Sequence, residues 1–295
     1  SSGRRSCSGS RGSLWPEHRR DQPFLPSHLY IQANIYLTKH TQKEYTGRVI
    51  EEIIREVPKI SHQQKIRQVV LGLGYIAVEV EGSGVGLCAN ILPEEKTSCT
   101  VFARAGSLKG STVADILDLG RKTDLLSRSI ALATANAVSN QEGSGYEGDV
   151  FDKVGVRQSD RATMVGFIAP VAAMLKAGGC TVDVFEHRDI RDERIRPHDA
   201  MEESMSRADI VILTATTIVN GSIRDILPLK TRARAVILMG PSTPMLPKAF
   251  SATPITLIAG CRVVDARRAM DIVMEGGGTQ ILYKNAAMKK IIREI

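Results

Sequence analysis

The chain has 295 residues, of which 43% are hydrophobic and 24% are charged, and these proportions are typical of an ordinary globular protein. Its net charge of +7 is concentrated near the start, where residues 1–48 hold eight Lys or Arg and three Asp or Glu. The rest of the chain is nearly neutral, which argues against a nucleic-acid partner. No run of about 18 apolar residues occurs, which argues against a transmembrane helix and a membrane partner.

Cysteine usage predicts a reducing compartment. The five cysteines are scattered and no two of them form a Cys-x-x-Cys pair (Cys7, Cys88, Cys99, Cys180 and Cys261). A disulfide framework is therefore not expected, and a cytoplasmic location is predicted.

Residues 1–44 are predicted to be a disordered basic tail, because their start is rich in Ser, Gly and Arg and cannot form a packed core. The same acid-poor composition fits a transit peptide. An over-extended reading frame and an expression remnant also stay open.

Residues 45–147 are predicted to form a small α+β domain. Apolar residues at i, i+3, i+4 spacing indicate a first helix over 46–57. The segments 68–80 and 84–92 flank a Gly-rich turn and predict a β-hairpin or meander. A helix that begins at Ser111 or Thr112 follows, and then a strongly apolar helix over 125–138.

Residues 148–295 are predicted to form a Rossmann-like domain, that is, a doubly wound parallel sheet of the α/β class. The Gly-, Ser- and Glu-rich residues 141–148 mark the boundary before it. Short apolar runs alternate with helix-length segments, as expected of strands buried on both faces. The expected strands cover residues 162–168, 180–185, 209–213, 235–239 and 256–264.

Two of these strands run into polar turns, at residues 214–221 and 240–244. In open α/β sheets ligands bind outside the carboxyl ends of the strands, so two adjacent polar tips predict a binding crevice. Part of this polarity can also be explained by helix capping, above all at Asn220. The candidate ligand-binding residues at the two tips are Thr214, Thr216, Thr217, Asn220, Gly240, Ser242 and Thr243.

The first strand-to-helix turn lacks the Gly-x-Gly-x-x-Gly pattern of dinucleotide-binding proteins. Only Gly166 is present before Pro170, although Glu186 lies 20 residues on, at a strand tip where a carboxylate could bind a ribose. Glu275 precedes three glycines, which suggest close backbone approach or a hinge. Gly166, Pro170, Glu186 and Glu275 are further candidate ligand-binding residues. His187 and His198 lie among arginines, which favours a solvated charged loop over a metal site.

Five motifs in order resemble the putative heavy-metal chelation domain family, at residues 164–170, 214–221, 239–244, 259–265 and 275–278. In that family a Rossmann-like domain follows an enolase-N-terminal-like α+β domain. Residues 73–92, the loop 105–110 and Asn136-Ala137 are similar to that partner domain, and the resemblance covers roughly residues 45–290. It implies a site between the two domains that binds a metal ion or a metal-bearing small molecule.

Three hypotheses follow. The first is a binding protein for a metal ion, metal complex or small molecule. The candidate site residues are mainly Thr, Ser, Asn and Glu, and these side chains favour a chelated metal or an anion over a bare soft cation. The second is an enzyme with a nucleotide-type cofactor, NAD- or adenosyl-type, in which Glu186 contacts ribose and Lys109 or Asn136 reaches in from the first domain. The third is an oligomeric scaffold without a ligand, so a homo-oligomer stays open.

Overall fold

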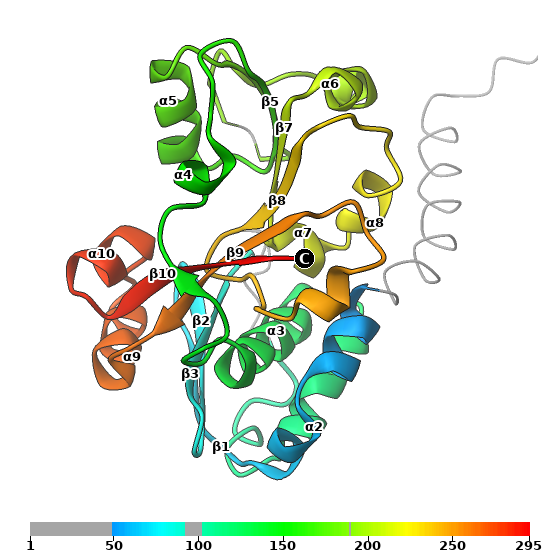
Figure 1. Ribbon diagram of the computed structural model, residues 1–295. Helices are drawn as coiled ribbons and strands as arrows, with labels where there is room; N and C mark the ends of the chain where they lie inside the picture. The colour runs from blue at the N-terminus through cyan, green and yellow to red at the C-terminus, as the bar shows by residue number, and fades with distance from the viewer. Residues whose placement is uncertain (1–48, 92–101, 189) are drawn as a thin grey trace, which may run out of the picture. The chain divides into compact units, whose positions relative to one another are not determined.

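The computed structural model describes residues 49–91, 102–188 and 190–295 (Figure 1). The prediction for residues 1–44 lies outside these residues. The described chain contains a three-stranded antiparallel sheet, followed by a seven-stranded, mostly parallel sheet with helices. The predicted fold class, α/β with a small α+β part first, is therefore confirmed. Among the described residues, no helix has the length and apolar character needed to cross a bilayer.

The small sheet is a meander of three six-residue strands in the order β1-β2-β3, where β1 is Ile66–Leu71, β2 is Tyr75–Val80 and β3 is Gly84–Ala89. Residues 49–56 form a helix and a 3₁₀ turn, η1 (Lys59–Gln63), leads into β1. The expected strand over 68–80 is divided, because the chain turns at residues 72–74 and the N–H of Gly72 donates to the carbonyl of Tyr75 at 2.9 Å.

Three helical segments follow this sheet: α2 (Val113–Leu117), η2 (Asp118–Arg121) and α3 (Leu125–Ser139). Helix α3 covers the sheet, and α2 and η2 pack against α3. Thr112 and Asp115 form a reciprocal capping box that starts α2. Asp124 caps α3 by accepting from the N–H of Ser127 at 2.8 Å. Helix α3 packs against β2 and β3 on one side and against the large sheet's helix α7 (Thr216–Asn220) on the other, so it is buried along nearly all its length.

The large sheet has the strand order β4-β10-β9-β8-β7-β5-β6. Its strands are β4 (Tyr146–Glu147), β5 (Arg161–Val165), β6 (Thr181–Phe185), β7 (Ile210–Thr214), β8 (Ala235–Met239), β9 (Leu257–Val263) and β10 (Met288–Glu294). The helical segments besides α7 are α4 (Val150–Val154), α5 (Ala169–Ala177), η3 (His198–Ala200), α6 (Met201–Arg207), α8 (Ile223–Ile226), η4 (Pro247–Phe250), α9 (Ala266–Met274) and α10 (Thr279–Lys284).

Strands β5 to β9 are parallel and stand in the order β6-β5-β7-β8-β9. This is the flavodoxin-like variant of the doubly wound sheet, in which the chain reverses its winding direction between the first and third strands. The switch point therefore lies between β5 and β7. Beyond β9, the antiparallel β10 pairs with β9 and with the two-residue β4.

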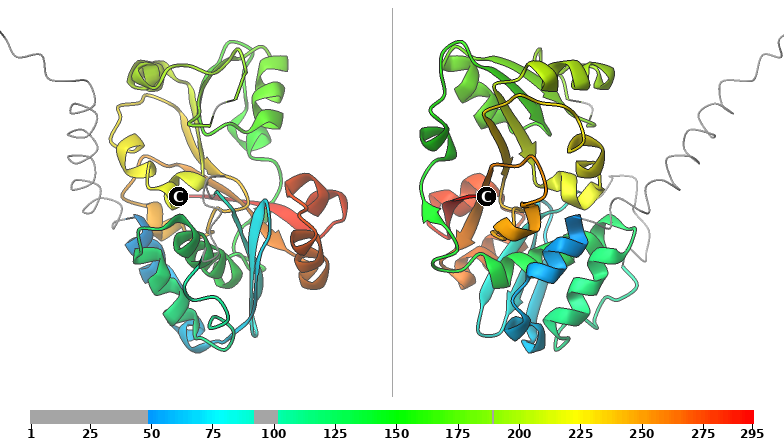
Figure 2. Two further views of the ribbon diagram at one scale, coloured as in Figure 1. Left: turned by 180° about the vertical axis from the view of Figure 1, so that it is seen from behind. Right: turned by 45° about the vertical axis from the view of Figure 1, so that its right-hand side comes forward.

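The two faces of the parallel strands are covered by different helices (Figures 1 and 2). Side chains such as Met164 and Ile212 pack with α4 and α5. Side chains such as Leu213 and Leu238 point to the opposite face and join a core that includes α7, α8, η4 and α3. Helix α3 thus covers one face of the small sheet and also belongs to the core that covers one face of the large sheet.

Candidate functional site

The tips of β5 and β7 meet at the switch point through Gly166. Its φ of +87° is a left-handed conformation that favours glycine. A Cβ added there would lie 2.0 Å from Cγ2 of Thr214, so a larger residue would push the two strand ends apart. The expected strand over 162–168 accordingly ends at Val165, and the N–H of Gly166 donates to the carbonyl of Phe185 at 2.8 Å.

The hydroxyl groups after β7 divide into two kinds. Thr214 and Thr216 are half-buried, and the Oγ1 of Thr216 donates to that of Thr214 at 3.2 Å. Thr217 is buried, and its hydroxyl donates to the carbonyl of Thr214 at 2.7 Å. The amide oxygen of Asn220 accepts from the N–H and the hydroxyl of Ser222, at 3.0 and 2.8 Å. Thr217 and Asn220 therefore stabilise the local turn. Asn220 is the last residue of α7, and no side-chain hydrogen bond caps the start of α8, so Asn220 does not act as the predicted helix cap.

The turn after β8 joins the two sheets. Gly240 has a φ of +117°, and its N–H donates to the carbonyl of Ala259 at 3.0 Å. Ser242 is buried, and its Oγ accepts from the N–H of Ala89, at the end of β3, at 2.8 Å. Thr243 is also buried, and its Oγ1 has no hydrogen-bond partner.

Asn136 of α3 lies against the same turn. Its Nδ2 donates to the carbonyl of Leu87 at 2.8 Å and reaches that of Pro241 at 3.4 Å. Because both carbonyls can only accept hydrogen bonds, the Nδ2 group must face them, which fixes the orientation of the amide. The Oδ1 of Asn136 therefore faces away from the two carbonyls and is buried without a hydrogen-bond partner. One helical turn later Asn140 bonds the carbonyls of Thr243 and Cys261, at 2.9 and 3.0 Å.

Glu186 holds the tips of β5 and β6 together. Its Oε2 accepts from the N–H of Phe167 at 2.9 Å and from the guanidinium of Arg188 at 2.7 Å. Its Oε1 accepts from the N–H groups of His187 and Arg188, at 2.9 and 3.0 Å. Burial disfavours the charged carboxylate, but the hydrogen bonds from Arg188 and the backbone outweigh it and lower the pKa of Glu186 to about 2.

The remaining predicted residues do not join this group. Pro170 is exposed in the first turn of α5. Lys109 is exposed beside Gly110, whose N–H bonds the carbonyl of Ile66, so it lies at the end of the small sheet away from Ala89. Glu275 is exposed after α9, next to the turn at residues 72–74.

Two residues near the β8 turn, Cys88 and Ser129, were not among the residues predicted from the sequence. The buried thiol of Cys88 hydrogen-bonds with Ser242 and Ser129, yet burial raises its pKa to about 12. Ser129 lies on α3 seven residues before Asn136, so the two side chains share one face of the helix. That spacing is the sequence signal that could have identified Ser129. Cys88 lies within an apolar strand, so its sequence context indicates only that it is a core residue.

The described residues do not fit a soft metal ion as direct ligands. No group of three His, Cys, Asp or Glu residues among them could hold one. Burial raises the pKa of both Cys88 and Cys261 to about 12, so neither offers the thiolate that soft metals require. The rings of His187 and His198 are stacked 4.2 Å apart, an arrangement that does not aim their nitrogens at one ion.

A nucleotide cofactor of the NAD type also fits poorly. A carboxylate has about four lone-pair sites, and local donors already occupy four at Glu186. It therefore has no free acceptor for a ribose diol. The turn that would approach a pyrophosphate carries Phe167 and Ile168 in place of further glycines.

The chain belongs to the family described as "Putative heavy-metal chelation". Two domain models of that description match it, DUF4213 over residues 50–139 and DUF364 over residues 149–292. The chain is 25% identical over 262 residues to an uncharacterized protein of Methanocaldococcus jannaschii, covering 82% of this chain and 96% of that protein. The division into domains at 45–147 and 148–295 stays a prediction.

Two solved structures of proteins with unknown function from the DUF364 family share the fold. One, from Desulfitobacterium hafniense, has a TM-score of 0.70 at 23% identity, covering 85% of this chain and 98% of its own. The other, from Pyrococcus horikoshii, also has a TM-score of 0.70 at 23% identity, and the match covers 84% of this chain and 100% of that one.

Proposed function

We propose that the chain binds a small molecule, or a metal ion carried within a small-molecule complex, at the carboxyl edge of its parallel strands. The residues expected to contact the ligand are Gly166, Thr214, Thr216 and Gly240, here called the carboxyl-edge site. The contact between Gly166 and Thr214 carries this proposal, because it lies at the switch point where sheets of this order bind ligands.

The chemistry of the carboxyl-edge site suits a polar ligand. Thr214 and Thr216 offer half-buried hydroxyls, and the glycines allow a ligand to approach the backbone. Asn136 and Thr243 add buried neutral oxygens without partners at the adjoining β8 turn. Hydroxyl and amide groups fix the orientation of small molecules or of the outer atoms of a chelate, whereas a bare soft cation would prefer thiolate or imidazole.

The other predicted residues have supporting roles in this proposal. Ser242 and Asn136 connect the turn after β8 to the small sheet and α3, so they would hold the shape of the site. Glu186 would fix the β5 tip, and its engaged oxygens give the nucleotide-enzyme hypothesis no support. A cytoplasmic location and a homo-oligomer remain predictions.

Native mass spectrometry of protein purified without chelators tests the proposal. We expect an organic or metal-containing adduct whose occupancy falls when Thr216→Val removes a hydroxyl at the same side-chain volume. Losing one such hydrogen bond should weaken binding by about tenfold. Thr231→Val, in the loop at the amino end of β8, is the matched control and should leave occupancy unchanged.

Titration calorimetry with bare Zn²⁺ and Cd²⁺ supplies the second arm. We expect neither ion to bind stoichiometrically, because the buried thiols are protonated. Tight Cd²⁺ binding that Cys88→Ser abolishes would contradict the proposal in favour of direct chelation. Absence of any adduct, together with no response in a thermal-shift screen of metabolites and metal chelates, would also count against it.

A further inference from the structure

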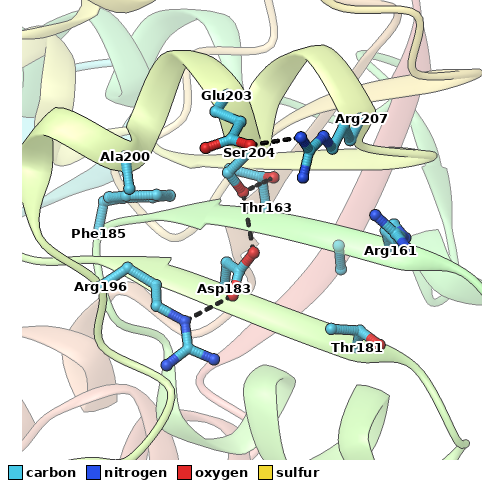
Figure 3. A pocket seen from close by; sticks show the side chains of 11 residues that line it. Arg161, Thr163, Thr181, Asp183, Phe185, Arg196, Ala200, Glu203, Ser204 and Arg207 are labelled. Atoms are coloured by element: carbon cyan, nitrogen blue, oxygen red, sulfur yellow. Dashed lines mark hydrogen bonds and ion pairs between the residues drawn. The ribbon is translucent and has the colours of Figure 1, made fainter.

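A cavity of about 230 Å³ lies beneath α6, along the face of β5 and β6 that this helix covers (Figure 3). Its floor comes from the strands, and its rim comes from α6, from η3 and from Arg196 just before η3. It does not include any residue of the carboxyl-edge site. A volume of this size has room for several water molecules or for a small polar ligand.

The two faces of β5 and β6 differ sharply in polarity. The face toward α5 carries only buried apolar side chains: Ala162, Met164, Val182 and Val184. The face toward α6 is mostly polar along the cavity: Arg161, Thr163, Thr181 and Asp183. Parallel strands covered on both faces are normally apolar on both. Arg161 and Thr181 are exposed at the amino ends of their strands, so solvent explains their polarity. Thr163 is only 1% exposed, and a buried polar residue of this kind is expected where function overrides folding.

A chain of hydrogen bonds organises the cavity floor (Figure 3). Ser204 of α6 donates to Oδ2 of Asp183 at 3.2 Å. Its hydroxyl has one hydrogen, so Thr163, at 2.7 Å, is the donor to Ser204. Arg196 donates through Nε to Oδ1 of Asp183 at 2.8 Å. The Asp183 carboxylate is thus fixed in place, with its charge balanced.

Positive charge exceeds negative charge around the cavity. Arg196 pairs with Asp183, and Arg207 pairs with Glu203 on its own helix. Within the described part of the chain, the guanidinium of Arg161 has no hydrogen-bond or ion-pair partner. One cation is therefore unmatched, and each guanidinium carries five N–H donors, most of which stay free.

We propose that this cavity binds a small hydroxylated oxyanion, of which a sugar phosphate is the model. The planar forks of Arg161 and Arg207 would bind the anionic group, since guanidinium matches phosphate and carboxylate oxygens in pairs. The carboxylates of Asp183 and Glu203 accept hydrogen bonds from ligand hydroxyls. A ligand with an anionic group but no hydroxyls would leave the two carboxylates without a partner on the ligand, and a ligand with hydroxyls alone would leave the arginines without one.

Titration calorimetry with four probes tests this site: ribose 5-phosphate, gluconate, inorganic phosphate and ribose. We expect ribose 5-phosphate or gluconate to bind at least about tenfold more tightly than inorganic phosphate or ribose, because only the first two combine an anion with hydroxyls. Preference between the two identifies phosphate or carboxylate as the anionic group.

Variants assign the binding to this cavity. Arg161→Gln should weaken it by about tenfold, the effect of losing a charge-assisted hydrogen bond. Arg267→Gln removes an exposed charge on α9 and is the matched control. Thr216→Val should have no effect, which separates this site from the carboxyl-edge site. Equal weakening by Arg267→Gln, or no binding of any probe at millimolar concentration, would overturn the proposal; circular dichroism confirms that each variant is folded.

Discussion

Individual polar residues at the strand tips differ mainly in whether the chain itself uses their hydrogen-bonding capacity. Glu186 is the clearest case, because four donors from Phe167, His187 and Arg188 saturate its carboxylate. Its side chain is only 8% exposed. The residue that a sequence argument would assign to a ribose therefore clamps the ends of β5 and β6.

The lowered pKa of Glu186 predicts how its contribution depends on pH. The hydrogen bonds to the carboxylate lower its pKa from the ordinary value of 4.5 to about 2 in the folded protein. Its stabilisation is therefore complete above about pH 5 and is lost as the pH falls toward 2. Glu186→Gln should lower the free energy of unfolding by about 2 kcal/mol at pH 7, the effect of losing hydrogen bonds to a charged group.

Urea denaturation between pH 7 and pH 3 measures this dependence. The difference between the natural chain and Glu186→Gln should shrink as the pH falls. Glu193→Gln, which breaks an exposed pair with Lys176, should change stability little. A difference that stays constant with pH would show that the carboxylate's charge is not what stabilises the clamp.

The sequence located the strand tips but not the fate of each polar group. Residues 214–221 and 240–244 do follow β7 and β8, because apolar runs and turn residues are local signals. The partners of these groups are distant in sequence: Ser242 bonds the N–H of Ala89, 153 positions earlier. No local pattern contains that information, so ligand-binding and structural hydroxyls could not be told apart.

At the scale of elements, α3 is unusual in having almost no solvent-facing side. Its small residues let β3 approach the helix backbone directly. A Cβ at Gly86 would lie 2.1 Å from both the carbonyl oxygen of Ala133 and the nitrogen of Ala137. This close contact sets the distance between the helix and the small sheet.

Gly86→Ala should therefore destabilise the protein by about 3 kcal/mol or more, because the clash is with backbone and cannot be relieved by a side-chain rotation. Gly74→Ala is the control, since a Cβ there meets nothing within 4 Å and the backbone is not left-handed. It should change stability by less than about 0.5 kcal/mol. Equal effects in thermal denaturation would disprove the packing explanation.

Element order was harder to predict than element type. The alternation of strands and helices predicted the parallel sheet, whereas the switch point between β5 and β7 depends on how strands pair in space. Two consecutive polar-tipped strands predict a crevice between β7 and β8 instead. Strand β4 has two residues, too few for any periodic signal.

For the molecule as a whole, Asn140 connects α3 to two parts of the large sheet. Its Nδ2 bonds the carbonyls of Thr243 and Cys261, and its Oδ1 accepts from the N–H of Met245 at 2.8 Å and from Ser139 at 2.9 Å. All four bonds are buried, where an unsatisfied group is most costly.

Asn140→Ala should lower the free energy of unfolding by about 3 kcal/mol, since it leaves backbone groups of both sheet connections without partners. Asn285→Ala removes the same side chain from a half-buried position whose hydrogen bonds are open to solvent, and it should cost less than about 1 kcal/mol. Urea denaturation followed by circular dichroism compares the two. Similar losses would mean that the Asn140 bonds do not hold α3 to the sheet.

The position of β10 has a consequence for biosynthesis. Residues 288–294 insert between β9 and β4, so β4 has no neighbour until these residues have been made. On the ribosome, the parallel strands β5 to β9 can pair in the order in which they emerge. Tyr146 and Glu147, translated about 140 residues before β10, must wait for it. Strand β10 therefore completes this sheet after its six other strands have been made, and a nascent chain that lacks β10 exposes the unpaired edge of β9.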